Sequence, residues 1–274
     1  MRQLIPLGIF LILVSCGQTE VKEIISTYDN GEPEVIFFYK VKGDTLTYRK
    51  ERFFKSGKCM YTGHVIKGVK DGVWTWWYEN GNKKDQCKYK NGFYADTVYH
   101  WFSNGQLSQI EIVPENKISY NNSCSCNGTI IRYFESGRLK EQFNSVQGKI
   151  IGKYRSFDEN GGWDVATYKD GIMHGDVHEH NLDSTGDLSI VIGQYNNGKE
   201  HGQWKWLDRD SLLLGTREYH QGELSGRYFK YYHNGKIEEE GNLVKGLVDG
   251  LVKFYDEEGK LVETQKYKLG EQLN

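Results

Sequence analysis

The chain has 274 residues, of which 32 are glycine, 3 are proline and 14% are aromatic. This aromatic content excludes a disordered linker, because disordered chains are poor in rings, and the scarcity of proline excludes collagen. A net charge of −2 shows no basic excess for nucleic-acid binding, and a hydrophobic content of 38% is too low for a protein that crosses a membrane many times.

The first fifteen residues predict an export signal. Arg2 precedes an apolar run from Leu4 to Val14, which has the length of a signal-peptide core and is too short to span a bilayer. The run ends in Ser15-Cys16, which resembles the lipobox of bacterial lipoproteins. We therefore expect residues 1–15 to be cleaved and Cys16 to become the lipidated N-terminus.

The residues after the cysteine refine this prediction. Two or three acyl chains on Cys16 give a durable membrane anchor, whereas a single chain binds only marginally. Gly17 follows the cysteine where an aspartate would indicate inner-membrane retention, so similarity to diderm lipoproteins favours the outer membrane. We expect residues 16–29 to form an N-terminal linker.

From residue 30 onwards the sequence repeats with a period of about 24 residues. We number each repeat from its opening residue, position 0. The opening residues are Tyr48, Gly72, Asp96, Gly128, Gly152, Gly175, Gly202, Gly226 and Gly250. A partial repeat with Asn30-Gly31 and Tyr39 precedes them, and residues 30–274 are expected to form one repeat domain without an internal boundary.

Two positions of each repeat hold strand-forming side chains. Position +2 is apolar or aromatic in every repeat from Gly72 onwards, and position +5 is so with the exception of His180. Such runs, bounded by turn residues, predict strands. The rings expected to be structural are Trp74, Trp77, Trp101, Tyr133, Tyr154, Phe157, Trp204, Tyr228, Tyr231 and Tyr255. An exposed stack of rings would bind a glycan or a peptide strand, but recurrence in register favours packing between neighbouring repeats.

Two kinds of turn separate the strands. Asn-Gly at 80–81 and at the equivalent place in other repeats supplies the positive φ of a tight hairpin. A second signal, Gly-x-x-x-Gly, occurs at Gly68/Gly72 and Gly222/Gly226 among others. In an apolar segment this spacing would indicate helix dimerisation in a membrane, but the residues between the glycines are polar. We therefore expect it to mark the return turn between hairpins.

The predicted fold is all-β: an elongated, twisted, single-layer antiparallel meander of about nine β-hairpin repeats, each packing only on its neighbours. Positions +2 and +5 have opposite parity and would point to opposite faces of a flat strand. Either a β-bulge re-aims one of them or both faces are partly covered.

The repeat motif resembles a known family. Gly-x-Trp-x-x-Tyr-Tyr-x-Asn-Gly-Lys, followed by a tyrosine and a glycine as at Tyr89 and Gly92, is similar to the variant MORN repeat over roughly residues 30–270. This form occurs in antitoxin proteins of the YwqK type and in lipoproteins of Bacteroidota-like bacteria. The resemblance implies a hairpin repeat fold and a role in protein contact or envelope association. The repeats opening at Asp96, Gly175 and Gly202 depart from the pattern, and their loops at 183–186 and 208–211 are expected to make specific contacts.

Cysteines offer one candidate disulfide. Cys59 and Cys87 fall on second strands of adjacent repeats, so one strand should separate them by about 9.6 Å, too far for a bridge. Cys124 and Cys126 lie in the one long insertion, and we expect a disulfide that involves this pair.

A weak metal signal lies at Asp176, His178 and His180, which share one face of a strand and could hold a divalent cation. The alternative is a polar strand that faces solvent. No other cofactor is expected.

A catalytic constellation is missing from the sequence, which contains no Gly-x-Ser-x-Gly, phosphate loop or His-Glu-x-x-His motif. The sequence therefore predicts a non-enzymatic, exported scaffold that is attached to a bacterial membrane by its lipid and binds a partner protein but no nucleic acid. Two alternatives stay open: an antitoxin or immunity protein that sequesters a toxin, and a module that binds glycan or cell wall.

Overall fold

The computed structural model describes residues 11–13, 20–40, 46–113, 127–182 and 188–273. All regular secondary structure in these ranges is β-strand, and none of these residues belongs to a helix long and apolar enough to span a bilayer. The chain forms two compact units. The N-terminal unit comprises residues 1–139 and 146–148, and the C-terminal unit comprises residues 140–145 and 149–274.

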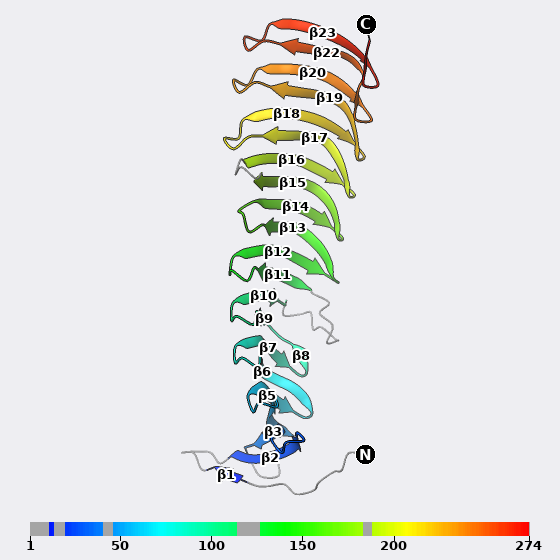
Figure 1. Ribbon diagram of the computed structural model, residues 1–274. Coiled ribbons are helices and arrows are strands. Elements are labelled where there is room, and N and C mark those ends of the chain that lie inside the picture. The colour runs from blue at the N-terminus through cyan, green and yellow to red at the C-terminus, as the bar shows by residue number, and fades with distance from the viewer. Residues whose placement is uncertain (1–10, 14–19, 41–45, 114–126, 183–187, 274) are drawn as a thin grey trace. The chain divides into compact units, whose positions relative to one another are not determined.

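The N-terminal unit is an antiparallel meander in which strands pair in chain order, with the short β8 attached to β7 (Figure 1). Its strands are β1 (Leu11–Leu13), β2 (Glu20–Thr27), β3 (Pro33–Tyr39), β4 (Thr47–Phe53), β5 (Cys59–Ile66), β6 (Val69–Trp77), β7 (Lys83–Lys90), β8 (Phe93–Tyr94), β9 (Thr97–Trp101), β10 (Leu107–Ile112) and β11 (Gly128–Tyr133).

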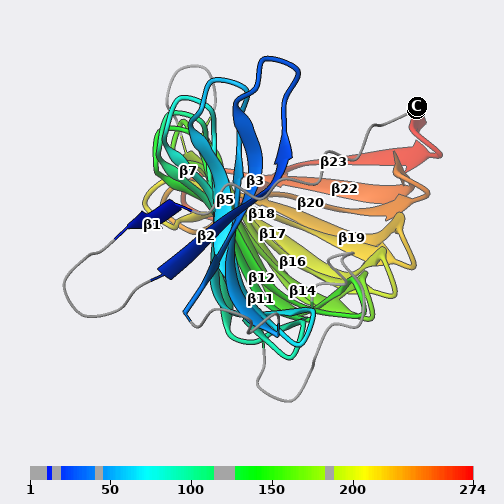
Figure 2. The same ribbon diagram turned by 90° about the horizontal axis from the view of Figure 1, so that it is seen from below.

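The C-terminal unit is also an antiparallel meander, with the short β21 attached to β20. Most of β12 (Leu139–Val146) belongs to it. The other strands are β13 (Lys149–Phe157), β14 (Trp163–Lys169), β15 (Ile172–Leu182), β16 (Leu188–Asn196), β17 (Lys199–Leu207), β18 (Leu213–His220), β19 (Glu223–Tyr231), β20 (Ile237–Val244), β21 (Leu247–Val248), β22 (Gly250–Tyr255), β23 (Leu261–Lys268) and β24 (Glu271–Leu273). Figure 2 shows these strands fanning out from β14 to β23, each turned relative to the one before it.

The predicted hairpin repeat is confirmed. The repeat opening at Gly72 is the hairpin of β6 and β7, and the repeat opening at Gly226 is the hairpin of β19 and β20. One part of the prediction is wrong: residues 20–27, placed in a linker, form β2, which pairs with β3 from Val21 to Thr27. The partial repeat is therefore a complete hairpin around Gly31. The short β1 lies within the predicted leader, while Cys16 lies outside the described residues.

The turn inside the repeats, wherever the structure describes it, is not the two-residue turn that Asn-Gly predicts. Tyr78 N donates to Asn82 O at 2.9 Å and Gly81 N donates to Tyr78 O at 2.9 Å, so the turn is wider. Gly81 has a φ of 96°, but Asn80 does not have a positive φ. Instead the Asn80 side chain acts: its Oδ1 accepts from Asn82 N, and its Nδ2 donates to Ser103 O of the next repeat at 2.7 Å.

The two-residue turns are the return turns between repeats. Lys67 and Gly68 have φ values of 50° and 81°, and Asn91 and Gly92 have values of 53° and 86°. Two consecutive positive φ values are the signature of a type I′ turn, whose twist matches that of the strands on either side. The first glycine of Gly-x-x-x-Gly therefore belongs to the tight hairpin turn.

Both faces of the sheet are partly covered, so positions +2 and +5 can both be apolar although they point to opposite faces. Position +2 is buried in most repeats, with exposures of 2% at Trp74, 5% at Val98 and 2% at Val252. Position +5 is half-buried in every repeat from Gly72 onwards. A bulge does occur near position +5, because Trp76 pairs with Asp85 and Trp77 with Lys83, but it inserts its extra residue in the second strand.

Candidate functional site

The rings at position +2 form the core on one face of each meander. Trp74 belongs to a buried cluster with Val65, Cys87, Tyr89 and Val98. In the C-terminal unit Trp204 clusters with Ala166 and Val177. Tyr228 is buried as well, whereas Tyr154 is half-buried.

Glycines in the second strands make room for these rings. A Cβ atom on Gly63 would lie 2.1 Å from the Trp74 ring, one on Gly193 would lie 2.2 Å from the Trp204 ring, and one on Gly241 would lie 2.6 Å from the Tyr228 ring. These three glycines do not have a positive φ, so the requirement is space and not backbone conformation. Where position +2 is the smaller Val98, its neighbour on β10 is the larger Glu111.

The opposite face carries a row of half-buried side chains at position +5. Most of them are aromatic: Trp77, Trp101 and Tyr133 in the N-terminal unit, and Phe157, Tyr231 and Tyr255 in the C-terminal unit, with His180 and Leu207 as the other members. Aromatic side chains with one apolar surface still in contact with water are enriched at protein interfaces. The row is therefore a surface that can contact a partner.

Two lysines stand among the core rings of the N-terminal unit. Lys70 Nζ lies 4.7 Å from the centroid of Trp74, 4.9 Å from that of Trp76 and 4.7 Å from that of Tyr89, and it donates to Tyr89 Oη at 3.3 Å. Lys50 Nζ lies 5.8 Å from Phe37 and 5.9 Å from Tyr61. These distances are within the range of cation–π attraction. We call these seven residues the Lys50–Lys70 surface.

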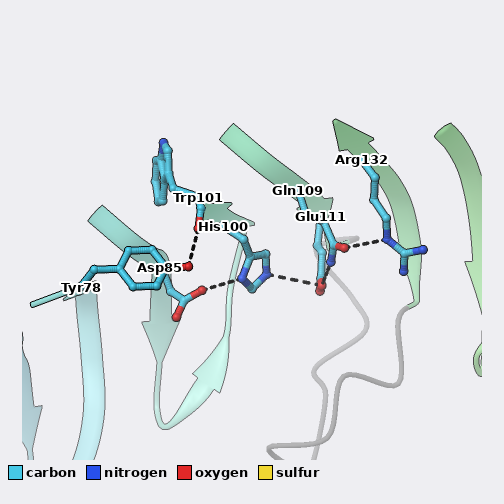
Figure 3. Close-up of polar contacts among 7 residues, drawn as sticks. All are labelled: Tyr78, Asp85, His100, Trp101, Gln109, Glu111 and Arg132. Atoms are coloured by element: carbon cyan, nitrogen blue, oxygen red, sulfur yellow. Dashed lines mark hydrogen bonds and ion pairs between the residues drawn. The ribbon is translucent and has the colours of Figure 1, made fainter. Parts of the chain in front are cut away.

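A polar network lies beside this surface, on β7, β9, β10 and β11 (Figure 3). His100 Nδ1 lies 2.6 Å from Asp85 Oδ1, and His100 Nε2 lies 3.5 Å from Glu111 Oε1. Gln109 Nε2 donates to Glu111 at 2.5 Å, and Arg132 Nε donates to Gln109 Oε1 at 2.7 Å. Glu111 is only 8% exposed, and it stands in a strand position flanked by two core residues.

The two carboxylates hold His100 in its charged form. Burial by itself would lower the pKa of His100, but the hydrogen bonds and negative charges of Asp85 and Glu111 outweigh it and raise the pKa to about 9. The imidazole is therefore protonated at neutral pH and lies between two acids. Since both ring nitrogens of a protonated histidine are donors, His100 is not suited to act as a base, and the network ties three strands together.

Sequence reasoning missed this network. The signal was present at Glu111, because the equivalent second-strand position is Gly63 in one repeat and Cys87 in another, where a charged residue has no place unless it is paired. Its partners, however, come from three strands and are identified only once the register is known.

The candidate metal residues do not converge. Asp176 accepts a hydrogen bond from Gln194 Nε2 at 2.9 Å, and His180 stacks on Trp163 with the ring centroids 3.5 Å apart. Burial, together with the neighbouring His178, lowers the pKa of His180. No three His, Cys, Asp or Glu side chains among the described residues are placed to hold a metal ion. Metal binding there stays a prediction.

The cysteines that the structure describes are free thiols. Cys59 is half-buried on β5 and Cys87 is buried on β7, with β6 between them. Burial raises the pKa of each thiol to about 11, so both are poor nucleophiles at neutral pH. Cys124 and Cys126 lie outside the described residues, and their pairing stays a prediction.

A groove of about 360 Å³ lies on the C-terminal unit, on the face that carries the core rings. Gly215, which pairs with Trp206 on one side and Lys230 on the other, is among the residues that line it. Glu239 is already paired there, with Lys230 Nζ at 2.6 Å and Tyr228 Oη at 2.6 Å. The groove is large enough to hold a ligand, but the carboxylate of Glu239 is already paired with Lys230 and Tyr228.

Comparison with protein families matches three parts of the chain. Residues 70–91, 224–245 and 248–269 each match the MORN repeat variant. The first two matched segments begin in the first strand of a hairpin and the third begins in the short β21, and each ends one residue after the second strand. No curated protein matches the chain in sequence. The matches support a MORN-repeat protein, and the repeated hairpin of the structure agrees with them.

Proposed function

We propose that this MORN-repeat chain is a non-catalytic scaffold that binds partner proteins at the bacterial cell envelope, held there by a lipid on Cys16. The observation that carries the proposal is the row of half-buried aromatic side chains at position +5. Six of the eight repeats from Gly72 onwards place a Trp, Tyr or Phe there. Tryptophan and tyrosine are the residues that most often dominate binding energy at protein interfaces.

The repeat architecture supports the same function. Each hairpin adds one copy of the same surface, so a partner contacts several equivalent rings at once and gains from their number. The resemblance to MORN-variant proteins implies protein contact and envelope association. A partner that is a toxin would make the chain an antitoxin, and a glycan partner would place it in another class.

Membrane attachment is tested by fractionation. Cys16→Ala removes the only side chain in the predicted lipobox that can take the diacylglycerol. We expect the wild-type chain in the membrane fraction and the variant in the soluble fraction, with labelling by a radioactive fatty acid lost. If Cys16→Ala remained in the membrane fraction, lipid anchoring at this residue would be wrong.

Partner binding is tested by photo-crosslinking in cells. Benzoylphenylalanine in place of Tyr231, at position +5 of β19, should give a crosslinked protein band. The control is the same group at Glu223, an exposed residue on the same strand. Crosslinks from both positions alike, or from neither, would contradict the assignment of the position +5 row as the binding surface. Crosslinks to polysaccharide alone would support the glycan class instead.

A further inference from the structure

The two ammonium groups of the Lys50–Lys70 surface lack a carboxylate partner. Neither lysine forms an ion pair within the described part of the chain, where Arg49, Arg52 and Lys55 of the same region all do. Lys70 is half-buried, and burial together with the charge of Lys50 lowers its pKa. A charged group that loses water without gaining a counter-ion is destabilised, and an arriving anion removes this cost.

The rings determine what kind of anion fits. Trp74 and Trp76 surround Lys70 at about the same distance, and Tyr61 lies next to Trp76 with the ring centroids 6.3 Å apart. Trp76 and Tyr61 are half-buried, whereas Trp74 is only 2% exposed, so an anion that reaches the ammonium passes the exposed surface of Trp76 and Tyr61. The methylene groups of a glutamate side chain pack on such rings, while its carboxylate reaches the cation.

We propose that the Lys50–Lys70 surface binds an acidic segment of a partner protein and places a glutamate or aspartate carboxylate against the two ammonium groups. The inference rests on the proposed function and names the chemistry of the partner. It also assigns the core-ring face of the N-terminal unit as a second contact surface, distinct from the position +5 row on the opposite face.

The packing of the strands keeps the two lysines on one face. Lys50 on β4 pairs with Gly63 on β5, which has no side chain to stand between β4 and β6. The Trp74 ring fills the space above Gly63 and lies 4.7 Å from Lys70 Nζ. Lys50 contributes to the lowered pKa of Lys70, so the two positive charges repel one another.

Fluorescence anisotropy tests the proposal with the full mature chain and a labelled octapeptide of alternating glutamate and glycine. We expect saturable binding at low salt that weakens as salt increases. The double variant Lys50→Met/Lys70→Met should weaken binding at least tenfold, and Lys50→Arg/Lys70→Arg should retain it. The tryptophan emission of the wild type should change on binding, because Lys70 contacts Trp74 and Trp76.

Matched controls separate charge from fold. Lys88→Met removes an exposed lysine of β7 that lies on the other face, and it should leave binding within twofold of wild type. The peptide with glutamine for glutamate should not bind. Thermal melts identify any variant that fails to fold, in which case the single variants replace the double one.

Three results would overturn the proposal: equal binding by wild type and Lys50→Met/Lys70→Met, binding of an oligouronate in preference to the peptide, or binding of phosphatidylglycerol vesicles in preference to the peptide. The proposed function is judged separately. If crosslinking at Tyr231 persists in cells while the peptide does not bind, the scaffold role stands and the Lys50–Lys70 site is wrong.

Discussion

Gly63 shows how the absence of one side chain fixes the position of another. Its place in the strand is taken by the Trp74 ring, which is 2% exposed and donates from Nε1 to His64 O at 3.0 Å. The same pairing of glycine and ring occurs at Gly193 and at Gly241. These glycines therefore belong to the core, although they look in the sequence like turn residues.

Gly63→Ala should lower the free energy of unfolding by about 1–3 kcal/mol, because the new methyl group overlaps the indole ring. Chemical denaturation measures the loss. In a Trp74→Val background, where the smaller residue leaves space, the same substitution should cost little. An equal cost in both backgrounds would show that the indole ring is not what excludes the side chain.

The His100 network makes stability depend on pH. The folded pKa of about 9 lies above the ordinary value of about 6.5, so protonated His100 stabilises the fold fully below pH 6.5. This contribution is lost as pH rises through about 9. The side chain is 32% exposed, and after allowance for solvent screening we expect the loss to be about 1–3 kcal/mol.

His100→Gln removes the titrating group, so the difference in unfolding free energy between wild type and variant should shrink from pH 6.5 to 9. Urea denaturation at a series of pH values measures it. The two thiols with raised pKa values are present in both proteins, so their contribution cancels in the difference. A difference that stays constant with pH would mean that His100 is not held charged by Asp85 and Glu111.

At the scale of the strand, four of the opening glycines are required by backbone conformation alone. Gly72, Gly152, Gly202 and Gly250 have positive φ values, and a Cβ atom there would meet nothing within 4 Å. Asp96 holds this position in one repeat with a φ of 114°, a conformation that costs a non-glycine residue about 1–3 kcal/mol. Its carboxylate recovers part of this cost by accepting from Thr97 N at 2.8 Å.

Asp96→Gly should therefore stabilise the chain by about 1 kcal/mol, which a thermal melt detects as a higher Tm. Gly250→Asp is the matched reverse substitution, because Gly250 has a φ of 102° and open space around it. It should lower the stability by about 1–3 kcal/mol. A lower Tm for Asp96→Gly would show that the contacts of Asp96 with Thr97 outweigh the strain.

Two kinds of side-chain hydrogen bond occur at the described turns inside the repeats. Tyr78 Oη donates to Trp101 O at 2.8 Å and Tyr232 Oη donates to Tyr255 O at 2.7 Å, so each tyrosine joins its turn to the next repeat. Asp158 at the equivalent position does not bond to the next repeat through these contacts; its Oδ1 accepts hydrogen bonds from backbone N–H groups of its own turn. The first kind connects repeats and the second stabilises a turn by itself.

At the scale of the molecule, the sequence predicts the repeat, the hairpin and the all-β fold, because position +2 and the glycines recur in register. It does not predict the return turn as the tight turn, since Lys67 carries no sequence mark of a positive φ and Asn91-Gly92 carries the same Asn-Gly signal as the wider turn at Asn80-Gly81. The network of His100 and the lysines among rings depend on which strands pair, and pairing register is decided by packing between repeats. Sequence periodicity alone cannot supply that information.

Strands pair only with their neighbours along each meander in the described part of the chain, so destabilisation should remain local. Hydrogen exchange measures this directly. Gly63→Ala should lower the protection of β5, β6 and β7, and Gly241→Ala, which crowds Tyr228, should lower that of β19 and β20. A loss of protection spread evenly over both units in either variant would contradict this expectation.

The row at position +5 also has a characteristic length. Equivalent residues of successive hairpins are two strands apart, about 9.6 Å, as for Trp77 and Trp101 in the N-terminal unit and Tyr231 and Tyr255 in the C-terminal unit. One turn of a polyproline II helix advances about 9.3 Å in three residues. A peptide in that conformation, lying across the strands, would present every third side chain to the same position of consecutive hairpins. The spacing of the repeat thus matches the pitch of a threefold peptide helix, and partner sequences with a three-residue period are the ones that would fit this surface best.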